Sequence, residues 1–100
     1  MSGDIIRNYS IYDLKSYISS GLPVVTPTDG QLLGNPNFRG DGPEYHMLVI
    51  TGYDDQKGIF ITNDPGTKNG EKYTYKYQTL LDAISGPEKN QEKAVIVLKN

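Results

Sequence analysis

The sequence predicts a single α+β domain, built on a twisted antiparallel β-sheet with one N-terminal helix and one short C-terminal helix. Apolar residues show helical spacing in two segments, at residues 10–21 and 77–84. The other apolar stretches are short and separated by turn residues, as is typical of strands. A length of 100 residues excludes two sizeable domains.

The first helix is predicted to begin after Ser10, whose hydroxyl can accept a hydrogen bond from the exposed amides of the first turn. Asp13, three positions further on, can complete a capping box. One apolar face follows at positions i, i+3 and i+7: Ile11, Leu14 and Ile18. The helix is expected to end at Gly21, because glycine readily adopts the left-handed conformation that closes a helix.

Residues 22–27 are predicted to form a short strand at a sheet edge or a strand end, since Pro23 and Pro27 cannot donate hydrogen bonds to a neighbouring strand. Residues 28–44 are rich in glycine, proline, asparagine and aspartate and are expected to form a long loop. Loops beyond about 12–15 residues are often functional, so this one is a candidate wall of a binding cleft. The alternative is a surface loop without a function.

A central hairpin is the clearest element that the sequence predicts. Residues 45–53 form its first strand, residues 54–58 its turn and residues 59–62 its second strand. The apolar run at 47–50 indicates a strand that is covered on both faces. A turn at Asn63-Asp64-Pro65-Gly66 is expected to close the hairpin.

The C-terminal part is predicted to contain a strand, a short helix and a final strand. Tyr73, Tyr75 and Tyr77 alternate as in a half-buried strand, which favours packing, with peptide contact as the alternative. A two-turn helix is expected over residues 77–84, and a buried strand over residues 94–98.

Composition excludes several classes of function. Ten basic residues against twelve acidic ones give a net charge of -2, and the basic residues form no run, so no nucleic acid partner is expected. The longest apolar run has five residues and no export signal opens the chain, so neither a transmembrane segment nor a signal peptide is predicted, and the compartment is left open. No cofactor is expected. No metal site is expected either, because the oxygen-bearing residues between 63 and 71 lack the calcium-loop spacing.

His46 is the single histidine and the main candidate for chemistry. It begins the first hairpin strand and Asp64 ends the second, so the two side chains are expected to meet in an antiparallel pair. Either Asp64 or Asn63 could accept a hydrogen bond from the imidazole, and a one-residue bulge would exchange the two. Glu44, two residues before His46, is a lesser rival. A strand histidine with a purely structural role is the other interpretation.

A nucleophile is missing from the sequence. The chain has no cysteine, which removes disulfides, thiolate metal sites and a thiol nucleophile. No serine lies in a G-x-S-x-G turn, so serine hydrolase chemistry has no support.

Four segments carry a resemblance to a known family. They are residues 21–25, 45–54 and 61–67, and residues 70–77 leading into the short helix. Together they resemble the C39-like family of papain-fold cysteine peptidases over residues 10–98, with the H-x-V-V-x-x-G-Y-D type of block followed by N-D-P-G as the specific feature. The resemblance covers only the C-terminal, sheet-bearing half of a papain-like fold. It implies that His46 is the general base and Asp64 its orienting carboxylate.

In that family the cysteine nucleophile and the oxyanion-hole glutamine lie on an N-terminal helical half that has no counterpart here. Residues 10–100 are therefore expected to form one partial C39-like domain, with residues 1–9 as a lead or vector-derived segment. The expected function is the His/Asp part of a cysteine peptidase acting on peptides or proteins, inactive as the isolated chain. A Cys-bearing half or a second copy of the chain would be its partner. Three origins would each explain the missing nucleophile. The chain is a fragment of a longer enzyme, one half of a split enzyme, or a natural degenerate that kept the fold and lost catalysis. The alternative is a noncatalytic peptide-binding or interaction module of the same fold.

Overall fold

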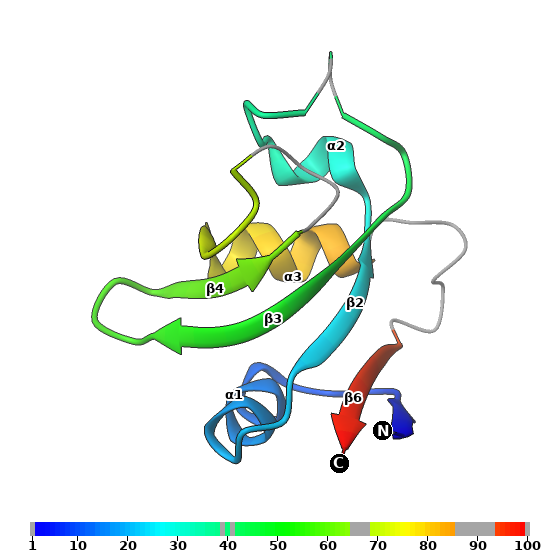
Figure 1. The fold of residues 1–100 in the computed structure, drawn as a ribbon, viewed down its shortest axis with the longest axis vertical. Coiled ribbons are helices and arrows are strands. Elements are labelled where there is room, and N and C mark those ends of the chain that lie inside the picture. Colours follow the sequence, from blue (N-terminus) through cyan, green and yellow to red (C-terminus); the bar gives the residue numbers. More distant parts are fainter. Residues whose placement is uncertain (1, 39, 41, 65–68, 86–93, 100) are drawn as a thin grey trace.

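The computed structural model describes residues 2–38, 40, 42–64, 69–85 and 94–99. Within these residues six strands form one antiparallel sheet in the order β1-β6-β2-β3-β4-β5, as Figure 1 shows in part. The predicted α+β fold class is confirmed. The elements are β1 Ser2–Ile6, α1 Ile11–Ser19, β2 Val24–Thr28, α2 Gly30–Leu33, β3 His46–Asp54, β4 Ile59–Asn63, β5 Tyr73–Lys76, α3 Tyr77–Ser85 and β6 Val95–Lys99.

Helix α1 forms as the sequence predicts. The Ser10 hydroxyl accepts a hydrogen bond from the Asp13 amide at 3.2 Å, and the Asp13 carboxylate accepts one from the Ser10 amide at 2.8 Å. These two bonds satisfy amides that the first turn leaves without a helical partner. Gly21 follows the helix with a φ of 81°, in the left-handed region. Leu14 is completely buried, so the apolar face of α1 packs into the core.

Of the two positions predicted for the strand that contains Pro23 and Pro27, the edge is wrong and the strand end fits, since Pro23 precedes β2 and Pro27 is its last residue but one. β2 lies between β6 and β3 rather than at an edge, and β1, which the sequence did not predict, forms the edge beside β6. The pairing of β2 with β6 ends at Val25, which pairs with Ile96. Pro27 lies beyond that point and pairs only with Met47 of β3. Its missing donor therefore breaks no bond to β6, which is how an interior strand accommodates proline.

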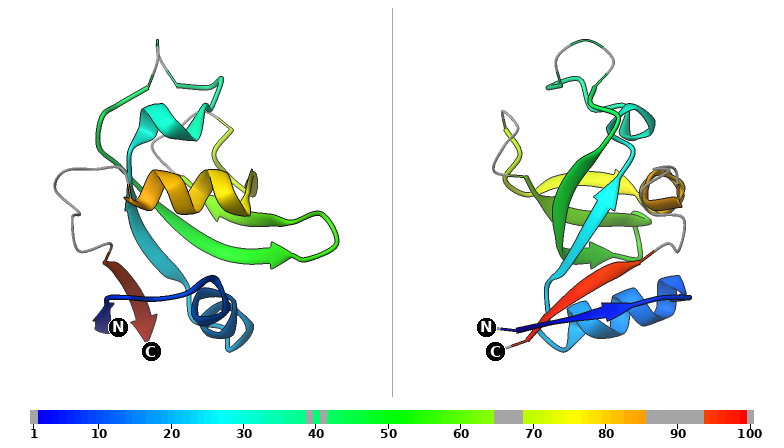
Figure 2. Two further views of the ribbon diagram at one scale, coloured as in Figure 1. Left: turned by 180° about the vertical axis from the view of Figure 1, so that it is seen from behind. Right: turned by 90° about the vertical axis from the view of Figure 1, so that its right-hand side faces the viewer.

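Both long helices cover the same face of the sheet. The right-hand view of Figure 2 shows α1 and α3 on one side of the strands. α1 packs on β2 and β3, and α3 packs on β2, β4 and β5. The core between them consists of Leu14, Val24, Leu33, Leu48, Ile50, Phe60, Tyr75, Leu80, Ala83, Ile84, Val95 and Val97.

The other face of the sheet is only partly covered. Met47 is 40% exposed and Val49 is half-buried, whereas Leu48 and Ile50 are buried. The prediction that residues 47–50 are covered on both faces is therefore wrong, because both helices pack on one side of the described sheet. The alternation is that of an antiparallel strand with one face in the core. Pairing of the chain with a second copy or with a Cys-bearing half stays a prediction.

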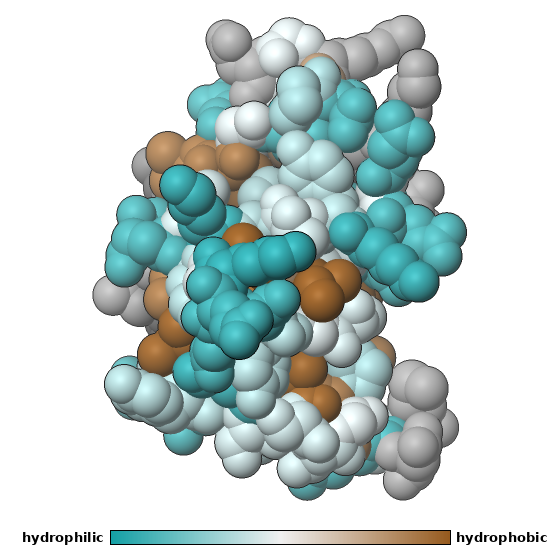
Figure 3. Space-filling view, turned by 90° about the vertical axis from the view of Figure 1, so that its left-hand side faces the viewer, coloured by the Kyte–Doolittle hydropathy of each residue, from teal (hydrophilic) through white to brown (hydrophobic). Residues whose placement is uncertain are grey.

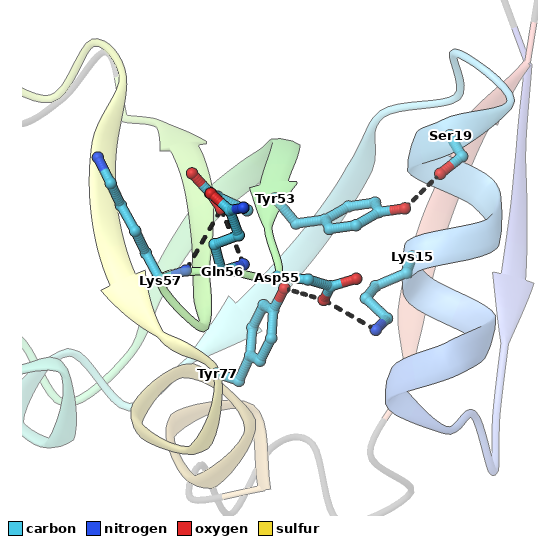
Figure 4. Close-up of polar contacts among 8 residues, drawn as sticks. Lys15, Ser19, Tyr53, Asp55, Gln56, Lys57 and Tyr77 are labelled. Atoms are coloured by element: carbon cyan, nitrogen blue, oxygen red, sulfur yellow. Dashed lines mark hydrogen bonds and ion pairs between the residues drawn. The ribbon is translucent and has the colours of Figure 1, made fainter.

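The turn end of the β3–β4 hairpin is tied to both helices (Figure 4). The Asp55 carboxylate accepts hydrogen bonds from Lys15 of α1 at 3.0 Å and from the Tyr77 hydroxyl at 2.6 Å. The Tyr77 and Lys15 bonds hold the pKa of Asp55 below its ordinary value. Ser19 and Tyr53 share a further hydrogen bond of 2.7 Å. This contact network fixes the hairpin against the helices at the end opposite to His46.

Seen from the side of this turn, the surface is mostly hydrophilic, and its hydrophobic areas are separated by polar side chains (Figure 3). None of the described helices is long and apolar enough to cross a membrane. The tyrosines predicted to pack do so: Tyr75 belongs to the core, and Tyr73 and Tyr77 pack against it. Tyr77 begins α3 instead of continuing β5.

The first part of the predicted loop, residues 28–33, has regular structure. Thr28 ends β2 and residues 30–33 form the short helix α2, which packs on α3. Asp29 caps this helix by accepting a hydrogen bond from the Gln31 amide at 2.9 Å. The predicted turn at Pro65 and Gly66 lies outside the described residues.

Candidate functional site

A β-bulge determines which residue of β4 faces His46. Val49 pairs with Asn63 and Ile50 with Thr62, but Gly52 pairs with Ile61, so Thr51 is the extra residue. Paired residues share a face and side chains alternate along a strand, so Asp64 lies on the face of Ile50, Leu48 and His46. Without the bulge, counting back from the turn would pair Ile50 with Asn63. Thr51 therefore selects Asp64 and not Asn63.

The side chains of His46 and Asp64 are in direct contact. Nε2 of His46 is hydrogen-bonded to Oδ2 of Asp64, across 18 residues of sequence. The His46 side chain is 18% exposed and that of Asp64 is 5% exposed. The predicted meeting of these two residues is confirmed. Glu44 is exposed, and among the described residues the side-chain hydrogen bond of His46 goes to Asp64 and not to Glu44.

This hydrogen bond defines the free nitrogen of the ring. A carboxylate only accepts, so Nε2 carries the donated proton and Nδ1 of the neutral ring holds the lone pair. Nδ1 has no hydrogen-bond partner among the described residues, and no buried side-chain nitrogen or oxygen among them lacks a partner. Nδ1 therefore retains contact with solvent. The arrangement presents one basic nitrogen outward while the other is fixed by a carboxylate.

Backbone and loop contacts hold both partners. The Thr28 hydroxyl donates to the backbone carbonyl of His46 at 2.7 Å, which reinforces the pairing of β2 with β3. The Asp64 amide donates to the Gly70 carbonyl at 3.0 Å. Asn63 points elsewhere, since its side-chain oxygen accepts a hydrogen bond from the Lys72 amide at 3.0 Å. Asn63 thus supports the chain that follows β4 and does not orient the imidazole.

Two contacts near the pair are made by residues that the sequence did not single out, Phe38 and Asn35. The Phe38 ring meets the His46 ring at 5.0 Å between centroids and an angle of 62°. Tyr75 lies on the same side of the sheet, and its hydroxyl accepts a hydrogen bond from buried Asn35 at 2.9 Å. Burial raises the pKa of Tyr75 to about 12, with smaller contributions that include the Asp64 charge. Phe38 and Asn35 both lie in the segment after α2. The glycine-rich composition of this segment was the only sign in the sequence that it could line a site.

A pocket adjoins Asp64. It has a volume of about 430 Å³ and is lined by Val49, Asn63, Asp64 and Glu71. This volume falls in the range of small-molecule and side-chain pockets, about 300–1,000 Å³. No group of three histidine, aspartate or glutamate side chains that could hold a metal gathers in the described part of the chain.

Comparison with known proteins gives the family. A sequence profile described as the Peptidase_C39 like family matches residues 2–92. Uncharacterised proteins of Mycobacterium tuberculosis and Mycobacterium bovis are 29% identical over 75 residues, which cover 70% of this chain and 32% of each relative. The matched chain thus spans about a third of the length of these curated relatives.

A solved structure shares the fold. The crystal structure of a candidate C39-like peptidase from Bacillus anthracis superimposes with a TM-score of 0.68 at 19% identity. The match covers 98% of this chain and 52% of that one, so the chain spans about half of its length. Because the profile covers most of its length, the chain belongs to the Peptidase_C39 like family.

Proposed function

We propose that this chain supplies the histidine and the aspartate of a Cys-His-Asp site that hydrolyses peptide bonds. His46 acts as general base and acid through Nδ1, and Asp64 orients the ring and stabilises the imidazolium. The cysteine comes from outside these 100 residues, which contain none. The observation that carries the proposal is the hydrogen bond from Nε2 to Asp64, since it leaves Nδ1 basic and in contact with solvent.

The proposed reaction follows from this arrangement. Nδ1 takes the proton of the cysteine thiol, and the thiolate attacks the peptide carbonyl carbon. The imidazolium then returns that proton to the leaving amine as the C–N bond breaks, which leaves an acyl-thioester. Water attacks the thioester with Nδ1 as general base, and the thiol is regenerated. Asp64 stays ionised throughout, and its charge favours the imidazolium at each protonated stage.

Peptides and proteins are the proposed substrates. The substrate class follows from the bond that a Cys-His-Asp site attacks. The pocket of about 430 Å³ does not select it, because Val49 and Asn63 in its lining lie on the sheet face opposite to His46. No cofactor enters this mechanism, because the nucleophile, base and orienting group are all side chains.

The second candidate is a noncatalytic peptide-binding module, favoured by the absence of cysteine from the sequence. A peptide strand has no room to add at Val24 and Val25, because β6 pairs with both residues. In the described sheet β1 and β5 are the outer strands, so a bound peptide would have to add beside one of them.

The test compares the chain alone with the chain joined to the cysteine-bearing half of a C39-like peptidase. The chain alone should neither hydrolyse a peptide panel nor react with thiol-directed probes. The joined protein should show turnover that falls by about 10²–10⁴ in His46→Ala, the range of general acid-base catalysis. Glu44→Gln is the matched control and should keep full turnover.

Hydrolysis by the chain alone would contradict the proposal, as would a joined protein whose turnover survives His46→Ala. A folded joined protein that binds peptides but shows no turnover, although its cysteine is reactive, would favour the binding module.

A further inference from the structure

The hydrogen bond to Asp64 fixes His46 at one atom only. The ring turns about its Cβ–Cγ bond, and the hydrogen bond restrains this rotation at Nε2 alone. Such a rotation would move Nδ1 away from its outward position. Catalytic groups need a geometry held by several contacts, because small misplacements reduce the rate strongly. A second contact on the ring is therefore required.

Phe38 provides that contact. Its ring lies 5.0 Å from the imidazole at 62°, an edge-to-face arrangement that aromatic pairs prefer. Phe38 packs against the ring while Asp64 holds Nε2, so the two contacts together restrict rotation about the Cβ–Cγ bond. We propose that Phe38 is a positioning residue that holds the His46 ring with Nδ1 outward. This inference rests on the role proposed for His46.

The segment carrying Phe38 is itself anchored to the sheet. The Phe38 amide donates to the Asn35 carbonyl at 3.1 Å. Asn35 is 6% exposed, and its side chain donates to the Tyr75 hydroxyl of β5 at 2.9 Å. Its side-chain oxygen accepts a hydrogen bond from the Asn37 amide at 2.8 Å. Phe38 is thus connected to the same sheet that carries Asp64. Both residues that contact the His46 ring are therefore held by one sheet.

Close packing of glycines holds the other side of Phe38. A Cβ atom at Gly42 would lie 2.9 Å from the Phe38 ring, and one at Gly30 would lie 2.5 Å from the Pro43 carbonyl oxygen. Residues 42 and 43 can approach α2 and Phe38 only because both glycines lack a side chain. Gly30 does not have a left-handed φ, so an alanine there tests this packing without backbone strain.

The experiment measures the order of the His46 ring in the folded chain by ¹³C relaxation of the Cε1–Hε1 bond. Phe38→Leu, which keeps an apolar side chain but removes the aromatic ring, should lower the order parameter from about 0.85 to below about 0.6. Phe38→Tyr should restore it, since the tyrosine ring keeps the edge-to-face contact. Gly30→Ala should lower it while Phe38 itself is unchanged.

The backbone amide order parameters of β3 serve as the control and should stay the same in all three variants. An unchanged ring order in Phe38→Leu, or a failure of Phe38→Tyr to restore it, would overturn the inference. If Phe38→Leu does not fold, Gly30→Ala alone decides: an unaltered ring order in that variant also contradicts the proposal. These measurements need no turnover, so they separate the positioning role from the peptidase function. If the His46 ring is rigid in the chain but the protein joined to a cysteine-bearing half is inactive, only the proposed peptidase function is contradicted, and the positioning role of Phe38 stands.

Discussion

Asp64 accepts a hydrogen bond from Nε2 of His46 because Thr51 forms a bulge in the opposite strand. The bulge changes which residue of β4 shares a face with His46, and it places Asn63 on the other face. Because Thr51 is left unpaired, the imidazole meets a carboxylate; a regular ladder that paired Thr51 would bring it to the amide of Asn63 instead. Only the carboxylate can stabilise the charged ring.

Asp64→Asn should change the proton positions on His46. The carboxylate accepts only, and so it favours the Nε2–H form, whereas an amide can donate or accept. We expect a mixture of both tautomers in the variant, read from the ¹⁵N chemical shifts of the two ring nitrogens. Asn63→Asp is the control and should leave the native pattern in place. A native pattern in Asp64→Asn would show that the carboxylate does not set the tautomer.

Deletion of Thr51 should keep the His46–Asp64 contact. Removing the extra residue leaves the pairs Val49–Asn63 and Ile50–Thr62 intact and makes the side chains of β3 alternate regularly. Cross-strand nuclear Overhauser effects between these pairs should therefore persist. New contacts between Ile50 and Asn63 would mean that the strands slip instead, and that Thr51 is not the extra residue.

Tyr75 should make the free energy of unfolding decrease at alkaline pH. Burial raises its pKa from 10.0 to about 12 in the folded chain, so its contribution is complete below pH 10 and is lost as the pH rises towards 12. The loss amounts to at most about 2–3 kcal/mol, at 1.36 kcal/mol per pKa unit. Denaturant unfolding between pH 8 and pH 12 measures it. In Tyr75→Phe the alkaline loss should shrink, with a remainder from Tyr9, whose pKa is also raised to about 12.

The same variant should be less stable at neutral pH. The side-chain amide of Asn35 donates to the Tyr75 hydroxyl, and phenylalanine leaves this buried donor without its acceptor. A buried unsatisfied donor costs about 1–3 kcal/mol. An equal stability of the two proteins at pH 7, or an alkaline loss as large as in the native chain, would speak against the described burial of Tyr75.

Asp55 should contribute to stability at neutral pH but not in acid. Its hydrogen bonds from Tyr77 and Lys15 lower its folded-state pKa, so the contribution is present above its ordinary value of 3.8 and is lost as the pH falls through the lowered value. Asp55→Asn should therefore be less stable than the native chain at pH 7, and the difference should shrink on acidification. Urea unfolding at pH 7 and at successively lower pH measures this. A difference that is independent of pH would assign the effect to packing.

The local elements of this protein can be predicted from its sequence. Ser10 and Asp13 cap α1, Gly21 ends it, and the hairpin forms around residues 55–58, because caps, periodicity and turns depend on neighbours a few residues apart. The single histidine and the aspartate before Pro65 were also predicted to meet, since the two ends of a hairpin lie side by side.

The tertiary structure alone decided the rest. It placed β6 between β1 and β2, put the bulge at Thr51, and brought Phe38 against His46. Strand order and register depend on packing between distant segments, and a shift of one residue reverses which face a side chain occupies. The sequence by itself determined which groups are available for chemistry. The assembled sheet determined which of them touch, because only packing of the whole chain fixes the pairing of its strands.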